Sequence, residues 1–236
     1  MLRVELEPAY VLHHRPFRDT SVLLEVFSLE HGRLGLVARG ARGPRSRMRG
    51  LLQPFRPLLL SWQLRGELGT LTAAELAEGA SVTPAGGDAL LGMFYLNELL
   101  LRLTGRLDPH REIYAAYAET VARLAGGEPV APALRCFEKR LLDALGYGPD
   151  LGRDTKGQAI DPEGSYCYEP TLGVAPCRAD AAGALRGASL LALAAGRLEQ
   201  PRALADARQL LRAALEVHLE GRPLRTREML GRLRSL

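Results

Sequence analysis

The sequence predicts an α+β protein, with an N-terminal five-stranded barrel of the OB type followed by an α-helical domain that carries a small irregular insert. Apolar and polar residues alternate in short segments over the first eighty residues, which is the two-residue period of strands. From about residue 84 the apolar residues recur at helical spacing instead. We therefore expect two domains, residues 1–80 and 81–236, with the insert at about 146–181.

Five strands are predicted in the first domain, and Gly or Pro marks most of the breaks between them. In the third strand Leu34 and Leu36 alternate with Arg33, which gives one apolar face and one basic face. Five short strands in so short a stretch favour a small closed barrel, a common platform for single-stranded nucleic acid. The predicted strands cover residues 9–16, 20–32, 33–40, 53–64 and 69–79.

The helical domain is predicted from apolar stripes bounded by capping residues. Its first helix is apolar nearly all round, as expected for the centre of a bundle. Asp108 signals the start of the next helix, and a short last helix is expected after Thr226 as N-cap. The main predicted helices run over 88–105, from Asp108 to Gly126, from near Pro132 to Gly146, over 184–196 and over 201–221.

Composition indicates an ordinary globular protein of 236 residues with a net charge of only +4. The charge is uneven, because both ends of the chain are basic and the middle is not. The N-terminus has no continuous apolar run, so we expect neither a secretory signal nor a membrane span. These features predict a cytoplasmic protein with no membrane partner.

Catalytic motifs are absent from the sequence. It has no G-x-S-x-G, P-loop, H-E-x-x-H or strand-linked G-x-G-x-x-G pattern. His13 and His14 are adjacent, so on a strand their side chains point to opposite faces and cannot ligate one metal together. The three cysteines, Cys136, Cys167 and Cys177, share no C-x-x-C spacing. We predict a protein that is not an enzyme, with no catalytic residue and no cofactor.

The most basic stretch, 39-RGARGPRSRMRG-50, holds five arginines and no acid. A solvated turn is one interpretation. The other is nucleic-acid binding, because guanidinium groups donate to phosphate in pairs and counterion release favours the contact. A second concentration, residues 221–236, either complements a helix dipole or makes a second contact. The candidate nucleic-acid-binding residues are Arg39, Arg42, Arg45, Arg47 and Arg49, extended by Arg15, Arg18, Arg33 and Arg65, with Arg225 and Arg227 near the C-terminus.

Aromatic residues that could stack on bases are few in the barrel. The candidates are Tyr10, Phe27, Phe55 and Trp62, and barrel core is the favoured interpretation for Phe27 and Phe55.

Five blocks carry a resemblance to a known family: 13-HHRPFRDTS-21, 36-LVARGARGPRSRMRGLLQPF-55, 95-YLNELLLRL-103, 134-LRCFEKRLLDALGYGPD-150 and 221-GRPLRTREML-230. In this order they resemble the RecO family of bacterial recombination mediators over nearly the whole chain. The resemblance implies an OB-fold, a helical domain and an insert that in many relatives is a four-cysteine zinc module. Here only Cys167 and Cys177 remain in the insert. Zinc is therefore not expected, and the insert is held by packing or by a Cys167–Cys177 bond.

The resemblance also implies a function in DNA repair without catalysis, in a cytoplasmic, nucleoid-associated setting. Such proteins bind single- and double-stranded DNA, anneal complementary strands, and with RecR help to replace single-strand-binding protein by RecA. The 36–55 block would supply the DNA-binding loop. The 134–150 block would place Arg135, Lys139 and Arg140 at a site for the acidic tail of single-strand-binding protein, although a charged helix face with Glu138 and Asp143 explains the same residues. A protein–protein adaptor or an RNA-binding OB-fold protein are the alternative functions.

Overall fold

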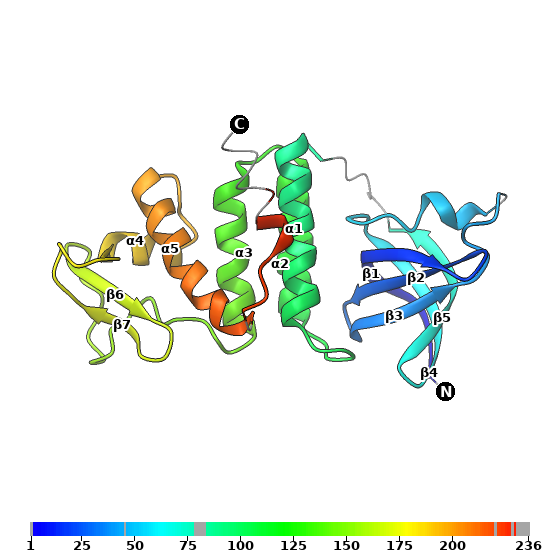
Figure 1. Ribbon diagram of the computed structural model, residues 1–236, viewed down its shortest axis with the longest axis horizontal. Coiled ribbons are helices and arrows are strands. Elements are labelled where there is room, and N and C mark those ends of the chain that lie inside the picture. The colour runs from blue at the N-terminus through cyan, green and yellow to red at the C-terminus, as the bar shows by residue number, and fades with distance from the viewer. Residues whose placement is uncertain (1, 45, 78–83, 220, 228, 230–236) are drawn as a thin grey trace. The chain divides into compact units, whose positions relative to one another are not determined.

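The computed structural model describes residues 2–44, 46–77, 84–219, 221–227 and 229 (Figure 1). The chain forms two compact units, residues 1–127 with 224–236, and residues 128–223. The first unit contains the barrel and the two helices after it. The boundary predicted at residue 80 lies outside the described residues, and it stays a prediction.

The barrel has five strands in the order β1-β2-β3-β5-β4, closed by the pairing of β4 with β1. Neighbouring strands are antiparallel except β3 and β5, whose parallel pairing aligns Gly35 with Leu68. This closed order confirms the predicted mixed α+β class with an N-terminal OB-type barrel. The strands are β1 (Leu2–Phe17), β2 (Ser21–Ser28), β3 (Gly32–Ala38), β4 (Leu58–Arg65) and β5 (Leu68–Leu76).

Strand β1 is long enough to pair with β4 through its first half and with β2 through its second. Its register shifts between Val4 and Glu7 and again between Val11 and His13. Such bulges bend a strand and increase its twist, which lets one strand serve two sides of a small barrel. The prediction that the first strand begins at residue 9 was wrong. The alternation from Leu2 onward belongs to the same strand.

The barrel core takes side chains from all five strands. Leu24, Val26, Leu34, Leu36 and Trp62 point inward and are almost fully buried. Their alternation with outward residues is the two-residue period that predicted the strands. The chain's single tryptophan therefore reports on the packing of the first unit.

Two helices complete the first unit, α1 (Gly87–Leu103) and α2 (Arg111–Ala125). Helix α1 buries residues on most of its circumference, as its apolar sequence predicts. The N-cap of α2 is His110, so the prediction that Asp108 caps this helix was wrong. Asp108 instead faces the His110 ring, with 3.2 Å between Oδ2 and Nε2.

A buried polar network joins the barrel to both helices. The Asn97 amide on α1 donates to the Leu12 carbonyl over 2.8 Å, at the bulge of β1. The Tyr117 hydroxyl on α2 donates to Asn97 Oδ1 over 2.7 Å. Tyr10 of β1 packs against the Tyr117 ring, with their centroids 5.0 Å apart. Burial raises the pKa of Tyr117 well above its usual value, so this hydroxyl stays a donor.

The second unit consists of α3 (Val130–Ala144), the insert, α4 (Gly187–Ala194) and α5 (Pro201–His218). The insert contains a three-stranded sheet in the order β7-β6-β8, formed by β6 (Ser165–Glu169), β7 (Gly173–Pro176) and β8 (Leu185–Arg186). Each strand contributes one buried apolar side chain, namely Tyr166, Val174 and Leu185.

The C-terminal segment returns to the first unit and docks on α1. Leu224 is buried, and residues 225–227 are helical. The Glu98 carboxylate accepts hydrogen bonds from the backbone of Arg225 and of Thr226, each at 3.0 Å, and from the Thr226 hydroxyl at 2.6 Å. The prediction of Thr226 as N-cap was wrong, because Thr226 lies inside the first turn and Glu98 caps it from outside.

We expect Asn97→Ala to lower the free energy of unfolding of the first unit by about 3 kcal/mol, because it leaves the Leu12 carbonyl and the Tyr117 hydroxyl buried without a partner. Tyr117→Phe removes one hydrogen bond and should cost about 1 kcal/mol. Urea unfolding followed by Trp62 fluorescence measures both. Equal midpoints for Asn97→Ala and the parent protein would contradict this account of the network.

Candidate nucleic-acid interface

The basic loop, residues 39–57 between β3 and β4, closes one end of the barrel (Figure 1). Ala41 and Leu52 are buried in the barrel core, and Met48 packs against the same cluster. Between them runs a 3-10 helix, Arg47–Gly50. The apolar residues of the loop therefore face inward and anchor it, while the residues between them are left on the outside.

Four arginines of this loop are exposed. Arg39, Arg42, Arg47 and Arg49 all lie on the surface. Within the described part of the chain, none of the four makes an ion pair with a carboxylate. Arg45, the fifth predicted residue, lies outside the described residues. Their positive charge is thus uncompensated at short range, which is the electrostatic condition for attracting a polyanion.

Hydrogen bonds fold the loop into a defined shape. The Gln53 amide donates to the Arg49 carbonyl over 3.1 Å, and Arg56 donates to the Gly50 carbonyl over 2.7 Å. The backbone of Arg42 donates to the Thr20 carbonyl over 2.8 Å, which ties the loop to the turn between β1 and β2. A surface that is already ordered loses less conformational entropy when it binds a ligand.

The turn between β1 and β2 adds two predicted arginines to this end of the barrel. Arg18 has left-handed backbone, with φ at 52°, and its guanidinium lies 5.2 Å from the Phe17 ring centre. Arg15 is exposed on the strand that leads to this turn. Because the Arg42–Thr20 hydrogen bond joins the turn to the loop, Arg15 and Arg18 extend the same basic surface.

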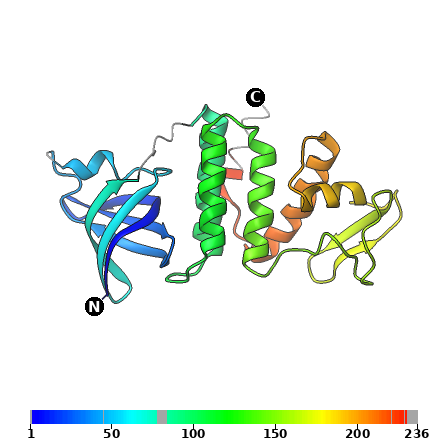
Figure 2. The same cartoon turned by 180° about the vertical axis from the view of Figure 1, so that it is seen from behind.

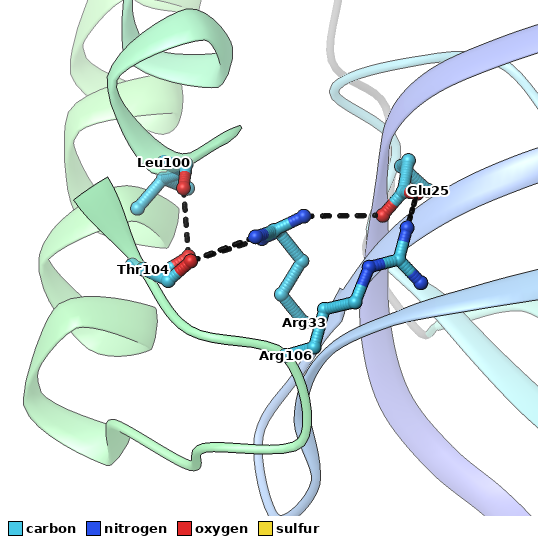
Figure 3. Close-up of polar contacts among 5 residues, drawn as sticks. All are labelled: Glu25, Arg33, Leu100, Thr104 and Arg106. Atoms are coloured by element: carbon cyan, nitrogen blue, oxygen red, sulfur yellow. Dashed lines mark hydrogen bonds and ion pairs between the residues drawn. The ribbon is translucent and has the colours of Figure 1, made fainter. Parts of the chain in front are cut away.

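Arg33 is taken up by the fold (Figure 3). Its side chain is only 14% exposed and donates to the Thr104 carbonyl at the end of α1, over 2.8 and 3.2 Å. It also pairs with Glu25, at 3.4 Å. Burial lowers the pKa of Arg33, Glu25 opposes this shift, and neighbouring Arg106 adds to it. Because its guanidinium already donates to Thr104 and Glu25, Arg33 is not available to bind a phosphate.

Arg106 covers the outer face of β2 and β3 beside Arg33. Its guanidinium pairs with the same Glu25 carboxylate (Figure 3). It lies over Gly35 of β3, where a Cβ would come within 3.1 Å of Arg106 Nη1, so the glycine makes room for it. The strand 2–3 face of OB-folds is a common ligand platform. Here the segment after α1 occupies part of that face.

The remaining predicted arginines lie elsewhere. Arg65 is exposed at the end of β4, the strand that starts directly after the basic loop, and so lies at the other end of the barrel. Figure 2 shows the barrel from behind. Arg225 and Arg227 lie on the C-terminal segment beside α1, where Arg227 Nη2 is 3.5 Å from the Tyr95 hydroxyl. The structure thus places Arg15, Arg18 and the four described loop arginines at one end of the barrel and Arg65 at the other.

The four aromatic candidates for base stacking are buried. Tyr10 and Phe55 are 6% and 5% exposed, and Phe27 and Trp62 are fully buried. The barrel-core interpretation of Phe27 and Phe55 was wrong, because Phe27 is buried against Tyr114 of α2 and Phe55 against Phe94 of α1. Tyr10 likewise packs against α2, and Trp62 lies in the barrel core. Their ring faces are covered by protein and cannot meet a base.

On α3, the three residues predicted to meet an acidic tail differ in exposure. Arg135 pairs with the buried Glu138, three residues on, and Lys139 pairs with Asp143, four residues on. Arg140 is exposed. The charged helix face weighed as the alternative is therefore present in the structure, and a contact with an acidic tail stays a prediction.

The insert places Cys167 and Cys177 side by side, with their sulfurs 2.6 Å apart. Among the described residues, no group of three or more His, Cys, Asp or Glu side chains could hold a metal ion. Two thiols fall short of the four ligands of a structural zinc site. The described sheet holds its own core instead, around Tyr166, whose hydroxyl accepts a 2.8 Å hydrogen bond from the Asp161 backbone.

Two site features were missed from the sequence. Phe17 precedes Arg18 directly, and this neighbourhood could have suggested the cation–π contact. Arg106 gave no local signal, because its partner Glu25 is 81 residues away. None of the helices in the described ranges has both the length and the apolar character needed to cross a membrane.

The chain is thus an OB-fold protein with a helical domain and a small insert. At one end of its barrel lies a cluster of arginines that make no ion pair with a described carboxylate. Family models described as Recombination protein O N terminal and Recombination protein O C terminal match residues 1–80 and 85–228. The chain belongs to the Recombination protein O family, which acts in DNA repair and recombination.

Curated relatives match along the whole chain. The protein named DNA repair protein RecO from Ralstonia nicotianae is 44% identical over 99% of this chain and 86% of its own length. Proteins of the same name from Azoarcus sp. and Chromobacterium violaceum are 43% and 44% identical, over 99% of this chain and 98% and 97% of their own lengths. Neither matched family description names a catalytic activity.

We expect Arg33→Ala to lower the free energy of unfolding of the first unit by about 2 kcal/mol, because charge-assisted hydrogen bonds to Thr104 and Glu25 are lost. Arg39→Ala is the matched control, an exposed arginine that should leave stability unchanged. Denaturant unfolding followed by Trp62 fluorescence compares the two. If both variants unfold at the parent midpoint, Arg33 does not join the barrel to α1.

A chelator should leave the thermal unfolding midpoint unchanged, because packing around Tyr166 holds the insert. The measurement is circular dichroism with and without EDTA, beside elemental analysis of the purified protein. Stoichiometric zinc together with a lower midpoint in EDTA would contradict this expectation.

Proposed function

We propose that the chain is a DNA-binding recombination mediator that makes and breaks no covalent bond. The observation that carries this proposal is the basic loop, where Arg39, Arg42, Arg47 and Arg49 are exposed and make no ion pair with a described carboxylate. Membership of the Recombination protein O family supplies the setting, repair and recombination of DNA.

The chemistry of the loop suits the DNA backbone. A guanidinium donates two parallel hydrogen bonds to a phosphate, and each neutralised phosphate releases condensed counterions. The proposed surface contains no carboxylate in the basic loop itself, so no acid there competes for these donors. It consists of Arg15, Arg18, Arg39, Arg42, Arg47 and Arg49, with Arg45 from the same loop.

Backbone contacts carry no sequence information, so this surface should accept single and double strands of any sequence. Annealing requires that the repulsion between the phosphates of two strands be reduced, and these arginines would reduce it. Arg65, Arg225 and Arg227 are then separate, secondary contacts. Arg65 lies at the other end of the barrel and the C-terminal pair lies beside α1.

Protein partners follow from the family setting. We propose that RecR and the acidic tail of single-strand-binding protein bind this chain during the exchange of single-strand-binding protein for RecA. Exposed Arg140, with Lys139 beside it on α3, is the proposed contact for the tail. Lys139 would exchange its Asp143 partner for a carboxylate of the tail.

Replacing Arg39, Arg42, Arg47 and Arg49 together with glutamine should weaken binding to a single-stranded oligonucleotide. Each lost phosphate contact reduces the slope of log K against log salt by roughly 0.7, so the slope should fall by about 3 if all four contact phosphate. Fluorescence anisotropy at four salt concentrations measures the slope.

The matched control replaces four exposed arginines of the second unit, Arg153, Arg186, Arg197 and Arg208, with glutamine. The net charge changes equally in the two variants, so only the position of the charge differs. An equal fall in slope for both would show that overall charge and not the loop drives binding. Weak binding of the parent protein at physiological salt would favour the adaptor function instead.

A further inference from the structure

One exposed aromatic side chain lies beside the basic loop. Phe94 of α1 is 41% exposed, and Leu90, one helical turn earlier, is 38% exposed. Covering a phenylalanine stabilises a protein by roughly 2 kcal/mol, so a ring left open beside a second apolar residue forgoes that gain. The pair forms a short apolar ridge on a unit whose other named aromatic candidates are buried.

The basic loop holds the Phe94 ring in position. Phe55, from the last part of the loop, contacts it edge to face, with ring centres 4.9 Å apart and planes at 76°. The Phe55 backbone is left-handed, with φ at 69°, a conformation that costs a residue other than glycine about 1 kcal/mol or more. Phe55 itself is buried, and the Phe94 ring that packs against it stays open to solvent.

Two arginines are linked to the surroundings of Phe94 through hydrogen-bonded neighbours. On one side, Arg56, which follows Phe55, donates to the carbonyl of Gly50, which follows Arg49. On the other side, Glu98 lies four residues further on the same face of α1, a rise of about 6 Å. Glu98 holds the backbone of Arg225, whose side chain is exposed.

The carboxylate of Glu98 is already satisfied. Three hydrogen bonds from Arg225 and Thr226 reach Glu98. Burial raises the pKa of Glu98, but these hydrogen bonds outweigh it and the net pKa is lowered.

We propose that Phe94 stacks on a base of a single strand whose phosphates contact Arg49 on one side and Arg225 on the other. Aromatic faces between cationic groups are the usual platform for single strands, because every base has a face to stack and its phosphate needs neutralising. This inference rests on the proposed DNA-binding function. It adds a preference for unpaired bases, since bases inside a duplex are already stacked on one another.

The test compares Phe94→Ala, Phe94→Leu and Phe94→Tyr in binding to an oligo(dT) strand and to a duplex of equal length. Stacking contributes about 1–3 kcal/mol per base, so Phe94→Ala should weaken single-strand binding by about 5- to 150-fold. Phe94→Leu keeps apolar area without an aromatic face and should lose a similar factor. Phe94→Tyr should bind as the parent does. Duplex affinity and the salt slope should not change.

A second measurement needs no variant. An abasic strand keeps the phosphates and lacks the bases, so the parent protein should bind it more weakly than oligo(dT), by the factor lost in Phe94→Ala. Equal binding of abasic and normal strands overturns stacking. So does an equal loss of duplex and single-strand binding in Phe94→Ala.

The outcomes also separate this inference from the proposed function. If Phe94→Ala binds DNA normally while the loop variant loses its salt slope, the function stands and stacking fails. If neither the parent nor the variants bind DNA, the proposed function fails. If Phe94→Ala binds DNA normally but no longer binds an acidic peptide with an apolar end, the ridge of Leu90 and Phe94 is a protein-binding site. The stacking proposal is then overturned.

Discussion

The side chain of Asn97 determines how the first unit is assembled. Its amide joins the bulge of β1 at Leu12 to α1, and its carbonyl accepts the Tyr117 hydroxyl from α2. An amide buried among apolar residues is tolerated only when both ends are satisfied. The barrel and the two helices can therefore pack only in the arrangement that satisfies it. That arrangement sets Phe94 of α1 against Phe55 of the basic loop.

The same docking divides the arginines into two kinds. Where the helices meet the barrel, Arg33 and Arg106 share Glu25, and Arg33 also caps the end of α1 at Thr104. These guanidinium groups stabilise the fold. Because they occupy part of the outer face of β2 and β3, the surface available to a ligand lies elsewhere on the barrel. At the barrel end, inward Ala41 and Leu52 anchor the loop, so its arginines need no carboxylate to stay in position.

The strands and helices could be predicted because each follows a local period, and the closed barrel followed from five short strands in a small space. The first strand was predicted to begin at residue 9, but it begins at Leu2, and Pro8 pairs with Leu59 of β4 in regular register. The loop arginines were found because they cluster in sequence. Arg33 could not be separated from them, since its partner Thr104 lies 71 residues away, and Phe94 gave no signal because its neighbour Phe55 belongs to another segment.

Charge in a sequence is therefore a poor guide to a binding surface until its partners are known. Arg33 and Arg49 are the same residue type on neighbouring segments, yet one is 14% exposed with three acceptor contacts and the other is exposed on a short helix without a carboxylate. A guanidinium already bonded to a carbonyl and a carboxylate would have to break those bonds before meeting phosphate, and the free energy lost would cancel much of the gain. An unpaired one gives up only water and counterions. The arginines proposed to bind a polyanion are accordingly those that pair with no described carboxylate. Among them Arg42 donates only to the Asp19 carbonyl, over 3.5 Å. They lie at the end of the barrel whose loop contacts an open aromatic ring.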